Sequence, residues 1–516
     1  MTLPPVTGAP ARAPRPVPGA SAPVPPFDPG LLAELADTAL SVAVAGGCAE
    51  AELRASCVRA GLVEVHDGRL AASTDEGEQG IAVRVLWHGR RGVASTSDRT
   101  PDAVAAAARR AVDLARRCAA AGMPETSPVP EPAHPGAAWR GGHEIDPLEV
   151  PTAERADLLA EWSAGLLRAG VERVRARLHA VRERTFLATL TGSTITQERV
   201  RVHPLVFASV RHPRSGDLVT ARSLGPPTAR GFEYLLGRGW DFEDELARLP
   251  EQLAETVHAP PVESGPTDLV IAPSNLWLTL HETVGHATEA DRVRGEEAAF
   301  AGTTFVRAED VGRLRYGSAG MGIVADRTLE HGLATTAYDD EGVATGAWPL
   351  VTAGVLTGLQ TDRAGAAALG EDRSRGCAYA QYPRDVPLSR MPNVSLLPDP
   401  DGPSLEELIG SVREGLYVDG SDSWSIDMQR RQFQFTAQRF HRIVDGRLAG
   451  QVRHAAYHGT TTRFWNSLEA VGGPGTYAVY GADLCGKGQP VQAAAVSHGA
   501  PATLFRGVPV SRTGAS

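Results

Sequence analysis

Lysine, cysteine and long apolar runs are scarce in this chain of 516 residues. A single lysine, Lys487, stands among 51 basic residues, so arginine carries almost all of the positive charge. The five cysteines lack paired spacing, which favours a reducing compartment over a disulfide framework. No apolar run reaches about 18 residues and no apolar leader is found, so we expect neither a transmembrane helix nor a signal peptide. These absences together predict a cytoplasmic protein that does not enter a membrane.

The charge balance of the chain is acidic. Sixty-one acidic residues against 51 basic ones leave a formal net charge of −10. General nucleic-acid binding usually needs a basic face, so no nucleic-acid partner is expected. Hydrophobic residues make up 42% of the chain, enough to build a substantial core. At roughly 150 residues per domain, the length predicts two to four domains.

Composition and periodicity divide the chain into five segments. Residues 1–30 are rich in proline and alanine and are predicted to form a disordered tail. Residues 31–122 and 151–250 each combine helical and alternating patterns, and each is predicted to be an α/β subdomain. Residues 123–150 are rich in proline and glycine and are read as a linker between them. Short strand patterns dominate residues 251–516, which predicts a β-rich C-terminal domain.

Helix-capping residues predict where individual helices begin, and alternating apolar and polar residues predict individual strands. Helices are predicted from residue 101 to 121, with Thr100 or Ser97 as the cap, and over 152–169. A further helix begins after Ser404, which has capping-box spacing to Glu407. Three alternating strands are predicted at residues 174–186, 188–202 and 205–212, with turns at 191–193 and 215–217.

A histidine pair lies on a helix predicted near residues 274–290. His281 and Glu282 are adjacent, and His286 follows five residues after the first histidine. Metallopeptidases use two histidines of one helix and a glutamate base, usually with the histidines four residues apart. A spacing of five leaves the two side chains about 140° apart on a regular α-helix. A metal site here therefore requires a π-bulge, or the end of the helix, near Gly285.

A catalytic metal site needs a third protein ligand. Cys485 lies in a glycine-rich turn, residues 484–489, where small neighbours let a thiolate approach an ion. Two nitrogens and one sulfur suit zinc, although a free cysteine is more often a small buried apolar residue. The sequence leaves six candidates for this ligand: His331, His454, His458, Glu289, Asp291 and Cys485.

These residues resemble the HExxxH signature of the TldD/PmbA metallopeptidases. Further matching segments follow in the family's order at residues 80–96, 339–342, 389–393, 415–418 and 484–489, so the resemblance runs from about residue 40 to 512. It implies an α+β fold, with an α/β N-terminal region and a largely antiparallel β C-terminal domain that carries the metal-site helix. It also implies Zn²⁺ held by His281, His286 and Cys485, with Glu282 as the general base.

The resemblance further implies an activity and partners. Members of the family hydrolyse unfolded peptides or peptide-like conjugates, as a homodimer or as a heterodimer with a metal-free PmbA/TldE-like paralogue. The alternative is a non-catalytic peptide-binding or scaffold subunit with a structural zinc. The intact Glu282 favours the enzyme, because a structural metal site needs no base.

Five more residues are candidates for supporting the site or contacting substrate. Lys487, or a backbone N–H near Gly486, could donate to the oxyanion formed during hydrolysis. Asp339 and Asp340 could orient a ligand histidine, although a polar hairpin turn is the favoured interpretation of that segment. Glu289 is a candidate for the same support. The lone lysine, two residues after Cys485, suggests a place that the planar fork of arginine does not fit.

Overall fold

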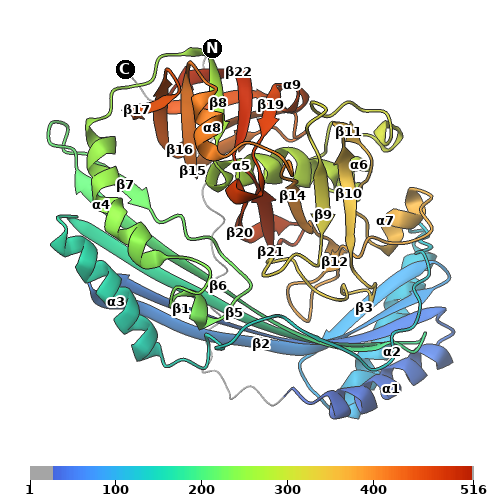
Figure 1. Ribbon diagram of the computed structural model, residues 1–516. Coiled ribbons are helices and arrows are strands. Elements are labelled where there is room, and N and C mark those ends of the chain that lie inside the picture. Colours follow the sequence, from blue (N-terminus) through green and yellow to red (C-terminus); the bar gives the residue numbers. More distant parts are fainter. Residues whose placement is uncertain (1–26, 514–516) are drawn as a thin grey trace, which may run out of the picture.

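The computed structural model describes residues 27–513 (Figure 1). The tail predicted for residues 1–30 lies outside the described residues except for its last four. Helix α1 (Pro29–Ala45) already begins within those four, with Asp28 as its cap. The side chain of Asp28 accepts hydrogen bonds from the backbone N–H groups of Gly30 and Leu31, so the described chain starts with a well-capped helix.

One seven-stranded sheet forms the N-terminal half of the molecule (Figure 1). Its strand order is β3-β2-β1-β5-β6-β4, with β7 paired to β6. The strands of both predicted α/β segments, and one strand within the predicted linker 123–150, thus belong to a single sheet. Its members are β1 (Glu50–His66), β2 (Arg69–Trp87), β3 (Arg90–Thr96), β4 (Ala137–Arg140), β5 (Arg173–Thr189), β6 (Thr194–Arg211) and β7 (Leu218–Arg222).

Helices cover the two ends of this sheet. Helix α1 packs with α2 (Pro101–Ala120) against β1, β2 and β3, and α3 (Thr152–Arg168) packs against β1 and β5. The predictions at 101–121 and 152–169 are confirmed, including the cap by Thr100. Helix α4 (Phe242–His258), which contacts α3, β6 and β7, was not predicted. In Figure 1 the sheet lies between helices α1 to α3 and the C-terminal domain.

The predicted division of residues 188–212 into two strands is wrong. Residues 194–211 form one continuous strand, β6, in which Pro204 stays in register opposite Leu178 of β5. Proline lacks an N–H group, but at this position neither β4 nor β7 is paired to the other side of β6. The missing donor therefore leaves the ladder intact. The turns at residues 191–193 and 215–217 join β5 to β6 and β6 to β7, as expected.

The C-terminal domain is β-rich and mostly antiparallel, which confirms the predicted α+β fold. A seven-stranded sheet has the order β15-β8-β22-β18-β16-β17 with β19 on β22, and only its β15–β8 pair is parallel. A four-stranded sheet, β11-β10-β9-β14, and the pairs β12-β13 and β20-β21 complete it. The strands are β8 (Gly265–Ile271), β9 (Ile323–Asp326), β10 (Ala347–Thr352), β11 (Val355–Leu356), β12 (Ala378–Tyr379), β13 (Leu388–Ser389), β14 (Asn393–Leu396), β15 (Glu414–Ile426), β16 (Gln432–Val444), β17 (Arg447–Val452), β18 (Ala455–Thr460), β19 (Leu468–Val471), β20 (Ala478–Lys487), β21 (Gln492–Ala500) and β22 (Thr503–Arg512).

Helix α5 (Pro273–Leu280) runs through the middle of this domain (Figure 1). It contacts β14, β15, β20 and β21, so strands from distant parts of the chain surround it. Helix α8 (Leu405–Gly410) has the predicted capping box between Ser404 and Glu407. The remaining helices are short: α6 (Ala290–Val293), α7 (Arg363–Ala368) and α9 (Thr461–Asn466). Within residues 27–513, no helix is both long and apolar enough to cross a membrane.

Candidate metal centre

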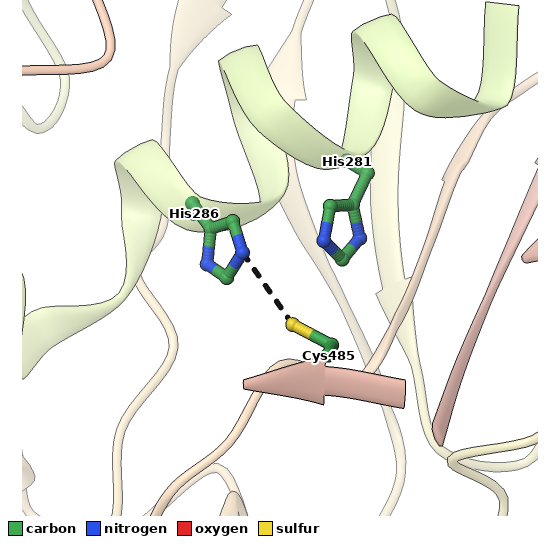
Figure 2. Close-up of side chains that lie close together, drawn as sticks. All are labelled: His281, His286 and Cys485. Carbon is green, nitrogen blue, oxygen red and sulfur yellow. Dashed lines mark hydrogen bonds between the residues drawn. The ribbon is translucent and has the colours of Figure 1, made fainter. Parts of the chain in front are cut away.

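The helix that carries the histidine pair changes its winding at the first histidine. Helix α5 continues as one π-helical turn, His281–Gly285, and then as a tight turn, His286–Thr288. The backbone N–H of His286 donates to the carbonyl of His281, which is the wider π pattern. Both imidazoles consequently project from the same side, with ring centroids 4.6 Å apart (Figure 2). The predicted π-bulge is confirmed.

Contacts from distant segments stabilise this irregular turn. Gly285 leaves room for Met391, whose sulfur would lie 2.4 Å from a Cβ at that position. The carbonyl of Gly285 accepts a hydrogen bond from the side-chain amide of Gln360 at 2.6 Å. The hydroxyl of Tyr316 donates to the carbonyl of Thr283. The backbone groups released by the bulge are thus paired, as buried polar groups must be.

Cys485 on β20 completes a buried cluster with the two histidines (Figure 2). One ligand atom from each of the three side chains lies within 4.8 Å of the others. The sulfur of Cys485 is 3.5 Å from Nε2 of His286. Of the six candidates for the third ligand, Cys485 is the one that joins this group in the described part of the chain.

Hydrogen bonds behind His281 determine which of its ring nitrogens carries the proton. Nδ1 of His498 lies 2.9 Å from the carbonyl oxygen of Val394, so it is assigned as the donor. Nε2 of His498 is then an acceptor, and it receives Nδ1–H of His281 at 2.7 Å. This assignment leaves Nε2 of His281 unprotonated and available to a metal. Burial holds the pKa values of His281 and His498 below their usual range, which favours the neutral rings.

A carboxylate fixes the second histidine in the same way. Nδ1 of His286 donates to Oε2 of Glu289 at 2.8 Å, so in the neutral ring Nε2, which faces Cys485, carries no proton and can bind a metal. Glu289 also accepts from Nε of Arg292 at 2.6 Å. Its predicted supporting role therefore fits its position, whereas the predicted alternative of Glu289 as the third ligand does not. His498 was missed by sequence reasoning because it lies 217 residues from His281 and has no local motif.

The surroundings of Cys485 favour its thiolate form. Burial by itself raises the pKa of the thiol, but the positive charges of a protonated His286 and of Arg390 outweigh it, so the pKa lies below its usual value. Arg390 donates to the carbonyl of Cys485 and, at 3.0 Å, to that of Gln492. It therefore also positions the strand that presents the sulfur. The thiolate is the form that binds metals.

Glu282 and the three cluster residues line one cavity of about 490 Å³. Arg430, on the loop between β15 and β16, forms an ion pair with the Glu282 carboxylate. Burial raises the pKa of this carboxyl, but the positive charge of Arg430 outweighs burial, and the pKa is lowered. Glu282 is therefore ionised at neutral pH. The apolar part of the wall consists of Leu205, Leu224, Pro226, Pro227, Trp277, Leu278, Trp424, Ile426, Ala482 and Leu484, with Tyr480 beside them.

The lone lysine forms an ion pair with Glu289, the carboxylate that holds His286. The Lys487 side chain is fully buried, and Nζ lies 3.1 Å from Oε1 of Glu289 and 2.7 Å from Oδ2 of Asp291. Nζ also donates to the carbonyl of Ser389 at 2.8 Å. Lys487 does not line the cavity, so the hypothesis that it contacts substrate or an oxyanion does not fit this position. Gly486 does line the cavity.

Lys487→Arg should weaken zinc binding by at least about tenfold, because residues that support a ligand typically contribute 10- to 100-fold in affinity. A planar guanidinium cannot replace a compact ammonium that donates to Asp291 and Ser389 and pairs with Glu289 in a closed space. Competition with a chromophoric chelator measures the affinity. Arg294→Lys, at a surface ion pair, is the control and should bind zinc normally. An unchanged zinc affinity in Lys487→Arg would mean that the lysine is not required to position Glu289.

Asp339 and Asp340 lie away from the cluster. The Asp339 carboxylate accepts from the backbone N–H groups of Glu341, Val343 and Ala378 at 2.8–3.0 Å. Asp340 accepts from the backbone of Ala380 and pairs with Arg54 of β1 at 3.3 Å. The hypothesis that these aspartates orient a ligand histidine is wrong, because His498 and Glu289 perform that task. The favoured interpretation as a polar turn holds, and the turn also joins the C-terminal domain to the N-terminal sheet.

Family models cover both halves of the chain. The model for PmbA/TldA metallopeptidase domain 1 matches residues 51–115. The model for the PmbA/TldA metallopeptidase C-terminal domain matches residues 264–512, which include all three cluster residues. The chain belongs to the PmbA/TldD metallopeptidase family.

Individual relatives agree with this assignment. A metalloprotease of Methanothermobacter thermautotrophicus is 28% identical over 473 residues, covering 90% of this chain and 95% of that protein. A zinc metalloprotease TldD homolog of Saccharolobus solfataricus is 26% identical over 259 residues, covering 50% and 55%. The crystal structure of TldE from Thermococcus kodakarensis has a TM-score of 0.69 at 17% identity and covers 93% of this chain and all of that one, which shows a shared fold.

Proposed function

We propose that this member of the PmbA/TldD family is a zinc-dependent peptidase with Glu282 as its general base. The observation that carries the proposal is the convergence of His281, His286 and Cys485 to within 4.8 Å beside that glutamate. Two imidazole nitrogens and one thiolate suit Zn²⁺, and three protein ligands leave a fourth position for reaction. The zinc metalloprotease name of the Saccharolobus solfataricus relative supports the choice of metal.

The chain's own residues have separate tasks in this proposal. When bound, zinc would lower the pKa of a water molecule and polarise the scissile carbonyl. The Glu282 carboxylate accepts a proton from the attacking water and returns it to the nitrogen of the leaving amine. His498 and Glu289 keep the two imidazoles in the tautomers that bind metal.

The proposed substrate is an unfolded peptide or a peptide-like conjugate. The cavity wall is largely apolar, and Gly481, Leu484 and Gly486 of β20 all lie in it. In the described part of the chain, β20 pairs only with β21. Its second edge can therefore take an extended peptide as an added strand, a mode that fixes the backbone without demanding one sequence.

The proposal includes a paired assembly, either of two copies of this chain or of this chain with a metal-free PmbA/TldE-like paralogue. The family assignment supports it. Size-exclusion chromatography with light scattering, on the chain alone and mixed with a candidate paralogue, distinguishes the two assemblies. Peptidase assays are run on both samples.

Removal of the metal should abolish hydrolysis of an unstructured peptide, and stoichiometric Zn²⁺ should restore it. Zinc at 100 times its dissociation constant should also stabilise the fold by about 2.7 kcal/mol, which a thermal melt detects. The measurement is peptide cleavage by mass spectrometry before chelation, after it and after zinc is returned. If zinc binds and stabilises the chain but no peptide is cleaved with or without a partner, the chain is the non-catalytic scaffold subunit instead.

A further inference from the structure

Arg430 touches the proposed base and lines the same cavity as the three ligand residues. A guanidinium has five N–H donors. One terminal nitrogen of Arg430 binds Oε2 of Glu282, and the other lies 3.2 Å from the carbonyl oxygen of Ala301. The buried Nε has no hydrogen-bond partner among residues 27–513. Arg430 thus brings more donors to this position than its present contacts use.

The backbone around Arg430 holds the side chain at this position. Arg430 has a φ of 58°, in the left-handed region that non-glycine residues rarely adopt. Its N–H donates to the carbonyl of Asp427 at 3.0 Å, and its carbonyl accepts from the Thr461 hydroxyl at 2.7 Å. Such strained conformations persist where the surrounding structure enforces them, often at functional sites.

The neighbouring loop is tied to a second segment as well. The carbonyls of Met428 and Gln429 accept from the backbone N–H groups of Thr303 and Phe305, both at 2.8 Å. A Cβ at Gly302 would lie 2.5 Å from the Met428 carbonyl oxygen, so the two segments approach as closely as glycine permits. Arg430 therefore projects from a loop that is fixed on both sides of it. A preorganised donor of this kind costs no reorganisation during a reaction.

A group in contact with the general base lies next to the reacting atoms, because the base must reach both the attacking water and the leaving nitrogen. Negative charge develops there on the oxygen of the scissile carbonyl. We propose that Arg430 is a further catalytic residue, whose guanidinium donates to that oxygen in the transition state while it retains Glu282. This inference rests on the proposed peptidase function.

Other cations of the described chain are placed less well for this task. Arg222 also lines the cavity, but its terminal nitrogen binds the Ser421 carbonyl at 2.7 Å and the Ser421 hydroxyl at 3.3 Å. Lys487 is buried behind Glu289 and does not reach the cavity. Arg430 combines contact with Glu282, access to the cavity and unused donors, so it is the residue to test.

The test compares Arg430→Ala, Arg430→Lys and the neighbouring control Arg431→Ala. Arg431 is exposed and does not line the cavity. Each variant is measured for zinc content, for kcat and KM on an unstructured peptide, and for the dissociation constant of a phosphinic peptide, whose tetrahedral anion resembles the transition state. Calorimetry gives that constant without any turnover.

Arg430→Ala should keep its zinc, lose about 100-fold in kcat and bind the phosphinic peptide about 100-fold more weakly, as for other lost oxyanion donors. Its KM should stay close to that of the wild type, because the contact is made mainly in the transition state. Added guanidinium ion should restore part of the rate, which a purely structural role does not predict. Arg430→Lys should recover part of both losses, and Arg431→Ala should match the wild type.

Two outcomes overturn the inference and are distinguishable. If the wild type cleaves peptide and Arg430→Ala keeps both its kcat and its affinity for the phosphinic peptide, Arg430 is only a partner of Glu282 and the proposed function stands. If the zinc-loaded wild type neither cleaves peptide nor binds the phosphinic peptide, the proposed function fails and this inference fails with it. If Arg430→Ala does not fold, Arg430→Lys decides, since wild-type affinity in that variant excludes a need for the guanidinium.

Discussion

Glu282→Gln should lose about 1,000-fold in kcat and still bind zinc. General acid–base catalysis contributes 10²- to 10⁴-fold, and an amide of the same shape can neither accept the proton of the attacking water nor return it to the amine. Glu282 is outside the metal cluster, so its removal leaves all three ligands in place. The measurement pairs zinc content by atomic absorption with peptide cleavage by mass spectrometry.

Arg430 makes the folding control for this variant important. The substitution leaves the buried guanidinium of Arg430 opposite a neutral amide, and a weakened buried contact of this kind costs about 1–3 kcal/mol. A thermal melt must therefore show that Glu282→Gln is folded at the assay temperature. Glu309→Gln, at an exposed position, is the matched control and should cleave normally. Undiminished cleavage by Glu282→Gln would remove Glu282 as the base.

Cys485→Ala should fold but bind zinc more than about 100-fold more weakly than the wild type. Residues that hydrogen-bond to a metal ligand already contribute 10- to 100-fold in metal affinity, and a thiolate that binds the metal directly contributes more. The two imidazoles that remain are one ligand short of the three protein ligands that a catalytic zinc site uses. Hydrolysis should disappear with the metal, and the zinc-dependent part of the thermal stability should disappear too.

The control for Cys485→Ala is another cysteine. Cys118 lies half-buried on α2, far along the chain from the cluster, and Cys118→Ala should retain zinc and activity. This comparison separates loss of a ligand from a general effect of removing a thiol. Full zinc retention in Cys485→Ala would place the third ligand elsewhere and would contradict the arrangement of the cluster.

Several local features of the fold were predictable because their causes lie within a few residues. Thr100 caps helix α2, and Ser404 with Glu407 forms a capping box at α8. The spacing of His281 and His286 required a π-turn, which the structure contains. The break predicted at Pro204 is absent from β6, because at this residue no second strand pairs with β6 and the missing N–H costs no hydrogen bond. Which strands pair is a tertiary property that the local sequence does not show.

The supporting residues of the candidate site were only partly predictable. Glu289 is three residues from His286, so one helical turn brings the two together. Arg430 lies 148 residues from Glu282, and His498 lies 217 residues from His281. No periodicity or motif of a single segment encodes such pairs. The roles of Asp339 and Asp340 are ambiguous in the sequence, since an acidic pair looks alike whether it orients a ligand or closes a turn.

The sequence by itself determined the metal-binding pattern, the family resemblance and the unusual position of the only lysine, because these depend on residue type and spacing. Tertiary structure decided the functions of the neighbours. It buried Lys487 behind Glu289, placed His498 behind His281 and set Arg430 against Glu282. The physical reason is that a tautomer, an ion pair or an oriented donor is a property of two groups in contact. In this protein most of those contacts join segments that are far apart in the chain.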